Sequence, residues 1–455
     1  MAFVRTTLAF AAVAMAFPAS AAAFTPGAPG LGDPYFPNAG NGGYDVREYD
    51  IKLRYEPRGR SIDARTWIHA TATQDLSAFN LDYAGPKVRK VRVNGEAAEF
   101  ARHGGELVVT PAEGIAAGQK FAVKVVYAGK PGTITDPDGA QEGWLETGTG
   151  VIVLAEPRGA VAWFPSNDTP ADKASFRITA DVPRALRAVS NGKLVERKRH
   201  GRRVTFSWRQ REPMATYLAT LAIGRFKLDT GRVAGVRYLN ALDVRLADRA
   251  RKRLRRTGGI LRLFNRIFGP YPFRQVGAIV IRSSSIGYAL ETQTRPFYPN
   301  APSGLLIAHE LAHQWFGDSV GLTVWRDIWL NEGFATWAEW RWLEEAGGPT
   351  TAETFEEYYA RQADTPAIWN PPPGDPGANR LFTQSVYVRG AMTLEALRQL
   401  IGDDAFYATL RAWTSTYRFG TVTTEDFIAL AEQHSGLDLH DFFTNWLYTP
   451  GKPAR

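Results

Sequence analysis

The chain has 455 residues, of which 44% are hydrophobic and 22% are charged, and its formal net charge is +8 at pH 7. This composition is that of a globular protein, and the length predicts two or more domains. The absence of cysteine excludes disulfide bonds and a lipidated cysteine. The cations are spread along the chain, and the one dense run, residues 249–256, indicates a solvated helix face, so we expect no nucleic-acid partner.

The first 23 residues have the three parts of a secretory signal peptide. Arg5 supplies the positive start, residues 8–17 an apolar core, and residues 19–23 small side chains suited to cleavage. The apolar core is too short to remain as a membrane anchor, and no later stretch approaches the length of a transmembrane helix. We therefore expect a secreted or periplasmic mature protein without an integral membrane segment.

Residues 24–228 are predicted to form a β-rich domain. Residues 24–43 are rich in Gly, Pro and Asn and predict a loose lead-in. From Tyr44 onwards, short segments of alternating apolar and polar residues follow one another, separated by turn-forming residues. One of these turns, Asn94-Gly95, is typical of a hairpin. Many short strands at this spacing favour a sandwich or a saddle-shaped β domain.

The pattern changes after residue 228, and residues 229–455 are predicted to form a mostly helical domain. Residues 247–268 have the spacing of an amphipathic helix, and residues 276–281 form an apolar run expected to be a buried strand. Further helices are predicted over residues 302–316, 332–345, 353–362, 385–401, 404–417, 424–434 and 438–447. The predicted fold class is therefore α+β, with an N-terminal β-sandwich or saddle domain followed by a mostly helical domain.

Residues 309–313 read HELAH, which places His309 and His313 four residues apart on one face of a predicted helix. This spacing suits two imidazole nitrogens that bind one Zn²⁺, with Glu310 beside the metal rather than bound to it. Glu332 supplies a third ligand, and three protein ligands leave one position open, as in a catalytic zinc site. The alternatives are a hydrogen-bonded histidine pair and, for Glu332, an acid favoured by the helix dipole. The three residues together favour zinc.

At these motifs the chain resembles the M1 family of zinc aminopeptidases, which are gluzincins with a thermolysin-like catalytic domain. The resemblance extends over nearly the whole chain, because other segments match motifs of the family in order. They are the β-domain signature at residues 163–170, with Ser166 where cysteine is common, the substrate-anchoring strand at residues 287–291, the catalytic-tyrosine motif at residues 387–390 and the end of the catalytic domain at residues 442–448.

The resemblance implies a role for each residue around the zinc ligands. Glu310 would take a proton from water and pass it to the leaving amine. Tyr387 would donate a hydrogen bond to the oxyanion that forms at the scissile carbonyl, although a core tyrosine is the alternative. Glu339, seven residues after Glu332, would accept a hydrogen bond from the far nitrogen of a zinc histidine, expected to be His313. A surface carboxylate is the alternative for Glu339.

The resemblance also implies recognition of a free N-terminus by two carboxylates. A carboxylate pairs with the α-ammonium of a peptide, and an internal amide cannot replace that cation. Glu291 matches the family's anchor, and Glu156 matches a second anchor contributed by the β domain, with an ordinary loop acid as the alternative. The backbone of Gly287, Tyr288 and Ala289 would lie beside the substrate like an added strand.

Two departures from the family pattern concern substrate choice. Leu154 stands where many relatives have glutamine, and Leu290 where methionine is frequent, so we expect a preference for uncharged, apolar N-terminal residues. The chain also stops near the end of the catalytic domain, without the large helical domain of many relatives, which implies a more open cleft. The predicted function is a secreted zinc aminopeptidase that acts on peptides with free N-termini. The alternatives are a zinc endopeptidase and a non-catalytic peptide-binding or scaffold member of the family.

Overall fold

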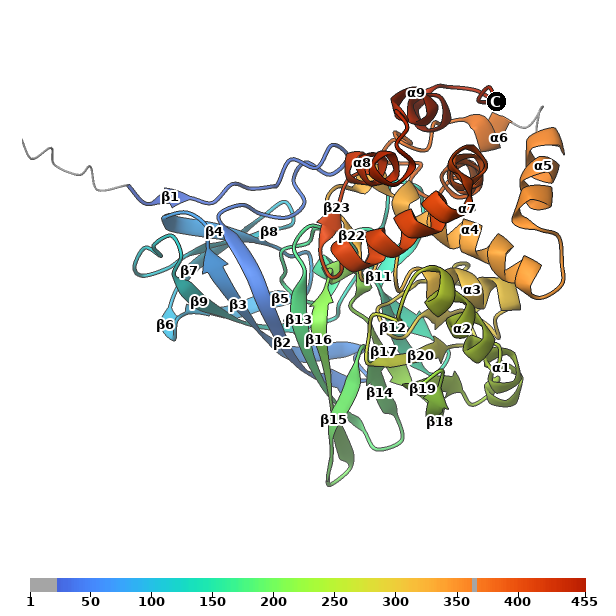
Figure 1. Cartoon of the computed structure of the whole chain (residues 1–455). Helices are drawn as coiled ribbons and strands as arrows, with labels where there is room; N and C mark the ends of the chain where they lie inside the picture. The colour runs from blue at the N-terminus through green and yellow to red at the C-terminus, as the bar shows by residue number, and fades with distance from the viewer. Residues whose placement is uncertain (1–22, 362–365) are drawn as a thin grey trace, which may run out of the picture.

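The computed structural model describes residues 23–361 and 366–455. The N-terminal half consists of β-sheets and the C-terminal half mostly of helices, and Figure 1 shows the two halves side by side. The predicted α+β fold class is therefore confirmed. The signal peptide predicted over residues 1–23 lies, except for its last residue, outside the described residues. The division after residue 228 stays a prediction.

The β-rich half is built from an eight-stranded, a four-stranded and a five-stranded sheet. The eight-stranded sheet has the order β15 (Lys193–His200), β16 (Arg203–Met214), β13 (Ala174–Pro183), β2 (Tyr44–Glu56), β3 (Ser61–Ala72), β9 (Lys120–Gly129), β5 (Lys87–Val93), β6 (Glu96–Ala97). The four-stranded sheet contains β1 (Thr25–Pro26), β4 (Leu76–Asp82), β8 (Glu106–Thr110) and β7 (Glu99–His103). The five-stranded sheet contains β10 (Thr133–Thr135), β11 (Gln141–Thr147), β12 (Gly150–Leu154), β17 (Leu221–Gly224) and β14 (Arg187–Ser190).

The sequence pattern explains these strands. Buried and exposed side chains alternate along β2 and β13, because successive residues of a strand point to opposite faces of the sheet. The turn predicted at Asn94-Gly95 joins β5 to β6, and its two residues have φ values of 51° and 94°. Positive φ at both central positions is the geometry of a type I′ hairpin turn, which asparagine and glycine adopt most readily.

The segment that precedes β2 is not the loose lead-in that its composition predicts. One oxygen of Asp33 accepts hydrogen bonds from the backbone N–H groups of Tyr35 and Phe36, and the other accepts one from the backbone of Trp325. The Tyr35 hydroxyl donates to Asp375 at 2.5 Å. These bonds fasten the segment to the helical half. A Gly- and Pro-rich composition predicts bends, but it carries no information on contacts with distant residues.

The C-terminal half begins with a four-stranded sheet and continues with helices. The sheet has the order β18 (Phe226–Val233), β19 (Val236–Asp243), β20 (Gln275–Val280), β21 (Phe297–Tyr298), and a small sheet pairs β22 (Gly321–Leu322) with β23 (Thr421–Val422). The helices are α1 (Ala247–Leu254), α2 (Thr257–Ile267), α3 (Gly304–Ala312), α4 (Trp329–Glu345), α5 (Thr351–Arg361), α6 (Pro366–Trp369), α7 (Gly390–Thr416), α8 (Thr424–Ser435) and α9 (His440–Phe443). Within the described ranges, none of these helices is both long and apolar enough to cross a membrane.

Two predicted helical regions differ in the structure. Residues 247–268 form two helices rather than one, because the chain leaves the helix after Leu254 and α2 begins at Thr257. The helices predicted on either side of Gly402 are joined as α7, which bends at this glycine where φ is 80°. A π-helical turn over Ser385–Arg389 precedes α7. The strand predicted at residues 276–281 is confirmed as β20.

Lys173 holds the two halves together near the loop that follows α3. Its ammonium donates to the backbone carbonyls of Asp318, Ser319 and Gly420 at 2.9, 2.8 and 3.1 Å. An ammonium has three donors, so these three acceptors satisfy it completely. The β13 strand is therefore anchored to the segments that end α3 and begin β23, which fixes the β-rich half against the histidine-bearing helix.

Candidate active site

The helix predicted to carry the two histidines is α3. It begins after Ser303, whose hydroxyl accepts a hydrogen bond from the backbone N–H of Leu306 at 3.0 Å. A serine in this position satisfies one of the free N–H groups of the first helical turn. The helix ends at Ala312, four residues earlier than predicted. His309 and His313 are buried on the same side of α3, with ring centroids 4.7 Å apart.

Glu332, in the first turn of α4, completes a cluster with the two histidines. Its Oε2 lies 3.2 Å from Nε2 of His309 and 3.4 Å from Nε2 of His313. The candidate ligand atoms of the three residues all lie within 4.8 Å of one another. Burial alone would raise the pKa of Glu332, but the two histidines outweigh burial and lower the pKa to about 2. The cluster therefore presents a carboxylate to two imidazoles.

The far nitrogens of both imidazoles are held by other groups. Nδ1 of His309 lies 2.7 Å from Oε1 of Glu339, and Nδ1 of His313 lies 3.1 Å from the carbonyl of Phe316. Donation from Nδ1 to these oxygens leaves Nε2 of each ring as a free ligand atom. Two imidazole nitrogens and one carboxylate oxygen at this spacing fit Zn²⁺. The three donor groups are therefore chemically suited to bind zinc.

The structure corrects the expected partner of Glu339. Glu339 was predicted to contact His313, but it contacts His309. The physical reason lies in the direction of the helices: Glu339 is two turns beyond Glu332 on α4, and this end of α4 passes His309. His313 lies at the end of α3, where the carbonyl of Phe316 is within reach of its ring. The spacing of residues along one helix does not reveal which residue of a second helix each of them contacts.

The cluster opens into a cavity of about 360 Å³, here called the site cavity. Its lining combines residues of both halves of the chain: Asp136, Asp138, Ala140, Glu156, Tyr288, Ala289, Glu291, Leu306, His309, Glu310, His313, Glu332, Glu339, Phe382 and Tyr387. Among them, Glu310 is buried, and burial raises its pKa to about 8, although His309 and His313 oppose this shift. A carboxyl group with a pKa near neutrality is suited to both accept and return a proton.

Tyr387 lies next to the zinc cluster, as the tyrosine motif predicts. Its ring is stacked on that of His309, with centroids 5.9 Å apart and planes inclined by 18°. Burial, followed by the charge of Glu332, raises the pKa of Tyr387 well above its usual value, so the hydroxyl stays protonated and can donate. The residue belongs to the π-helical turn before α7, a form of helix that is frequent at functional sites.

Arg389 fixes the turn that carries Tyr387. The guanidinium is fully buried and has no carboxylate partner among the residues that the structure describes; instead it donates to backbone carbonyls at distances of 2.6 to 3.0 Å. The acceptors are the carbonyls of Trp369, Asn445, Trp446, Thr449 and Gly451. The tyrosine is thereby tied to the C-terminal segment of the chain, and sequence analysis did not identify this role of Arg389.

Glu156 and Glu291 reach the site cavity from opposite halves of the chain. Oε1 of each is buried and has no hydrogen-bond partner among the described residues. Burial raises the pKa of both carboxyl groups, and for Glu156 the charge of Glu291 raises it further. A buried carboxylate oxygen without a partner is unfavourable, and because Glu156 and Glu291 also line the site cavity, their free oxygens point to a ligand there.

Gln314 positions Glu291 and was missed by sequence analysis. Its side-chain amide donates to the backbone carbonyl of Glu291 at 2.8 Å, and its carbonyl oxygen accepts from the backbone N–H of Thr294 at 2.7 Å. Asp136 and Asp138 of the site cavity were missed as well. Their sequence context, with proline between them and glycine after them, indicates only a turn.

The segment that was expected to anchor substrate runs along the edge of the site cavity. Tyr288 and Ala289 line this cavity, whereas Gly287 lines a neighbouring groove of about 750 Å³. The Tyr288 hydroxyl donates to the carbonyl of Gln141 at 2.6 Å and so fastens the segment to β11. It is not a regular strand, since Leu290 forms only an isolated bridge with Phe297. Its backbone is therefore available to pair with an extended peptide.

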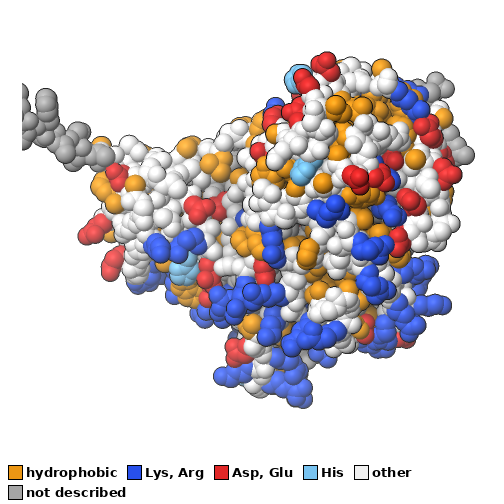
Figure 2. Space-filling model, in the orientation of Figure 1, with side chains coloured by type: hydrophobic (Ala, Val, Ile, Leu, Met, Phe, Trp, Pro, Cys, Tyr) orange, Lys and Arg blue, Asp and Glu red, His pale blue; other side chains and the backbone are white. Residues whose placement is uncertain are grey.

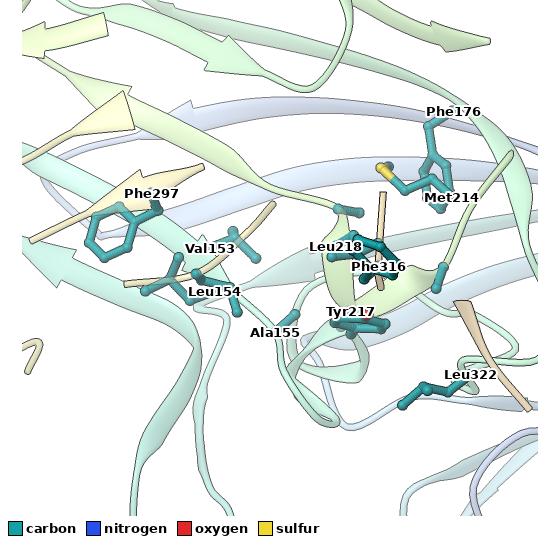
Figure 3. Close-up of a cluster of buried hydrophobic side chains, with 14 of the residues drawn as sticks. Val153, Leu154, Ala155, Phe176, Met214, Tyr217, Leu218, Phe297, Phe316 and Leu322 are labelled. Carbon is teal, nitrogen blue, oxygen red and sulfur yellow. The ribbon is translucent and has the colours of Figure 1, made fainter. Parts of the chain in front are cut away.

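Leu154 and Leu290 do not line the site cavity, which removes the basis of the predicted apolar pocket. Both are buried in the hydrophobic core. Figure 3 shows Leu154 among buried apolar side chains, together with Val153, Ala155 and Phe297. The end of β12 is buried on both faces, so an apolar residue there is explained by core packing and gives no information on the substrate pocket.

Two family models match the chain. The Peptidase M1 N-terminal domain matches residues 46–218, and the Peptidase family M1 domain matches residues 275–446. Aminopeptidase M1 of Arabidopsis thaliana is 29% identical over 333 residues, which are 67% of this chain and 37% of that protein. Leucyl aminopeptidase of Saccharolobus solfataricus is 25% identical over 440 residues, 90% of this chain and 54% of that protein. The chain thus spans about half or less of these curated relatives.

A solved structure matches over its whole length. The M1 zinc metallopeptidase from Deinococcus radiodurans is 29% identical, with a TM-score of 0.86, and the match covers 93% of this chain and 99% of that one. Its likeness agrees with the order of a β-rich domain and a helical domain that bears the zinc cluster. From the family models, the shared fold and the donor set, we conclude that the chain belongs to peptidase family M1 and that His309, His313 and Glu332 form its candidate zinc site.

Proposed function

We propose that this chain is a zinc-dependent aminopeptidase that removes N-terminal residues from peptides. One observation carries the proposal: Glu156 and Glu291 present unpartnered carboxylate oxygens to the cavity that contains the zinc ligands. The α-ammonium of a free N-terminus would satisfy both carboxylates, whereas the neutral amide of an internal peptide bond would leave them unpaired. The geometry therefore favours cleavage next to a free N-terminus.

The residues around the zinc site have different roles in hydrolysis. When bound, Zn²⁺ supplies Lewis-acid polarisation of the scissile carbonyl and acidifies water. Glu310 removes the proton of the attacking water and later returns it to the leaving amine. The Tyr387 hydroxyl donates to the oxygen of the scissile carbonyl as that oxygen gains negative charge. Glu156 and Glu291 hold the ammonium, which fixes the distance from the N-terminus to the reacting bond.

The backbone of the substrate would lie against Tyr288 and Ala289. Among the described residues, Tyr288 and Ala289 belong to no strand pair, so an extended peptide can add to their backbone as a strand. Strand addition binds any sequence of residues, because it uses backbone groups only. The arrangement suits a peptidase that accepts many peptides and selects mainly at the N-terminus.

The preference for uncharged, apolar N-terminal residues stays a prediction, and the lining of the site cavity supports its apolar part but not the exclusion of cationic residues. Leu306 and Phe382 supply apolar surface in the site cavity, while Asp136 and Asp138 add carboxylates that suit a cationic side chain. Solved structures of a two-domain M1 zinc metallopeptidase mutant carry L-tryptophan or L-arginine, and one from Deinococcus radiodurans carries Tyr-Ser-Ala. These ligands support a pocket that accepts both apolar and cationic side chains.

A panel of aminoacyl anilides tests the proposal. We expect hydrolysis of leucyl and arginyl anilides that a chelator abolishes and Zn²⁺ restores, and no hydrolysis of their N-acetylated forms. Equal cleavage of free and acetylated substrates would establish the endopeptidase alternative. A protein that binds one Zn²⁺ and hydrolyses none of the unblocked substrates would establish the non-catalytic alternative.

The location of the protein outside the cytoplasm is part of the proposal. It rests on the charged start, apolar core and small residues of the first 23 positions. Expression of the full chain in bacteria followed by N-terminal sequencing of the periplasmic protein tests it. We expect a new N-terminus near residue 24, and an uncleaved chain that stays in the cytoplasm would contradict the prediction.

A further inference from the structure

A groove on the side of the molecule formed by the β15–β16 and β18–β19 hairpins is rich in cationic side chains. Its volume is about 570 Å³, and its lining contains six cationic side chains and a single carboxylate, Glu212. The cations are Lys193, Arg209, Arg211, Arg232, Arg237 and Arg274. This set of side chains and the space between them are called the basic groove below.

The cations of the basic groove have almost no partners. Arg274 forms an ion pair with Glu212 at 3.4 Å, and Arg232 donates to the carbonyl of Gly235. In the part of the chain that the structure describes, no ion pair or side-chain hydrogen bond involves the four other cations, which are Lys193, Arg209, Arg211 and Arg237. Asp229 of β18 is nearby in sequence, but its carboxylate faces Arg251 at 3.5 Å.

Both hairpins place like charges directly opposite each other. Lys193 of β15 is the cross-strand neighbour of Arg209 of β16, and Arg232 of β18 is the neighbour of Arg237 of β19. Like charges in directly opposite positions destabilise a pair of strands. The sequence therefore places repulsive pairs on both walls of one groove. This repulsion destabilises the fold, and a bound anionic ligand would offset it.

The positive charge continues beyond the groove. Figure 2 shows Lys and Arg side chains gathered over the lower part of the molecule, where Figure 1 places β15, β18, β19 and α1. The far part of β15 and the outer face of α1 contribute exposed cations, among them Arg197, Lys198, Arg199, Arg249 and Lys252. An apolar side chain, Val195, stands 45% exposed at the groove itself. The charged area is therefore broad and belongs to both halves of the chain.

We propose that the basic groove and the surface around it bind an anionic phospholipid membrane, with headgroup phosphates entering the groove. A broad basic surface matches an extended anionic surface better than it matches one small anion. Single-stranded nucleic acid is a poorer match, because such sites stack bases on exposed aromatic rings, and Phe273, the aromatic residue of the groove, is buried. The membrane would hold the enzyme on one side and leave the site cavity on another part of the molecule.

Co-sedimentation of the purified full chain with lipid vesicles tests the proposal. We expect binding to vesicles of phosphatidylcholine with one third phosphatidylglycerol, weak binding to pure phosphatidylcholine, and loss of binding in 1 M salt, where the screening length falls to about 3 Å. A variant with Lys193→Gln, Arg211→Gln and Arg237→Gln should bind roughly 100-fold more weakly, since each cation near an anionic membrane contributes about fivefold in affinity.

A matched variant separates the effect of the groove on binding from the effect of net charge. Lys87→Gln, Lys90→Gln and Lys120→Gln remove three exposed cations from β5 and the start of β9, at the opposite edge of the eight-stranded sheet from β15. We expect this variant to bind the anionic vesicles within about twofold of the parent, and both triple variants to hydrolyse an aminoacyl anilide at the parental rate.

Four results would overturn the proposal. They are no binding to the anionic vesicles, equal loss in both triple variants, displacement from vesicles by millimolar glycerol phosphate, and tighter groove-dependent binding to an oligonucleotide than to vesicles. Displacement by glycerol phosphate would indicate a site for a small free anion, and the oligonucleotide result would indicate a nucleic-acid partner. Thermal unfolding of all variants, compared with the parent, ensures that a loss of binding reflects the groove and not the fold.

Discussion

The site cavity and the basic groove both lie where the two halves of the chain meet, but they carry opposite charges in different surroundings. Most carboxylates of the site cavity are buried or half-buried, and among the described residues Oε1 of Glu156 and of Glu291 has no hydrogen-bond partner, so a bound cation would offset an unfavourable burial. The cations of the basic groove are mostly exposed, and water and salt screen them. A few buried charges can therefore select one chemical group, whereas many exposed charges are needed together to bind a ligand.

This difference has a consequence for how each region responds to substitution. Loss of one buried group in the site cavity should change turnover or affinity by orders of magnitude. Loss of one exposed cation in the groove should change binding only several-fold. Substitutions of buried groups test this difference, and their expected effects decrease from Glu310 to Asp172.

The largest effect is expected from Glu310→Gln. This change removes the proton acceptor but keeps the shape of the side chain, so kcat should fall by about 10² to 10⁴-fold. Zinc content, measured by atomic absorption, should stay at about one per chain. Glu332→Ala is the contrast, because it removes a ligand and should lower the zinc content itself. Loss of zinc in Glu310→Gln would contradict the assignment of Glu310 as a residue that does not bind the metal.

Tyr387→Phe should have the next largest effect. The phenol ring that stacks on His309 is kept and only the hydroxyl is lost. Because the hydroxyl bonds mainly to the charged transition state, kcat should fall by about 10² to 10³-fold with a small change in KM. Steady-state kinetics on a leucyl anilide measures both. Full turnover in this variant would show that the stacked tyrosine has a packing role only.

Glu291→Gln should weaken substrate binding by about 10 to 100-fold in kcat/KM, which corresponds to the loss of one charged hydrogen bond. The same change replaces a buried, unpartnered carboxylate with a neutral amide, so the substrate-free protein should become more stable to urea. Lower activity together with higher stability is the signature of a buried binding charge. A variant that loses both activity and stability would place Glu291 among the structural residues instead.

Asp172 offers a smaller, pH-dependent test of how a buried carboxyl group changes the stability of the fold. Burial raises the pKa of Asp172 to about 7, although Asn167 donates to its carboxylate at 2.6 Å. Because the folded-state pKa lies above the ordinary value, the protonated form stabilises the fold. This stabilisation is complete below about pH 4 and is lost as the pH rises through 7, at up to about 1.4 kcal/mol per pH unit.

Asp172→Asn removes this titration. The difference in the free energy of unfolding, parent minus variant, should therefore decrease between about pH 4 and pH 7 and then remain constant. Urea unfolding at four pH values in this range measures the difference, with the exposed Asp63→Asn as a control substitution. A difference that does not change with pH would show that Asp172 ionises in the folded chain as it does in the unfolded one.

Several features of the site could be predicted from the sequence because they depend on residues close together in the chain. The four-residue spacing of His309 and His313 places both on one face of a helix, and the structure confirms that Glu332 meets them. Contacts between distant segments could not be predicted in the same way. The pairing of Glu339 with His309 depends on the crossing of α3 and α4, and Leu154 faces the core because β12 is buried on both faces.

The sequence by itself determined the fold class, the candidate zinc ligands and the resemblance to the M1 family, since local spacing and motif order carry that information. Only the tertiary structure decided which carboxylates remain without partners, because burial and hydrogen bonding depend on every segment that surrounds a side chain. The same holds for the basic groove. Its cations lie far apart in the chain, and only the packing of the two hairpins brings Lys193 and Arg237 to one surface.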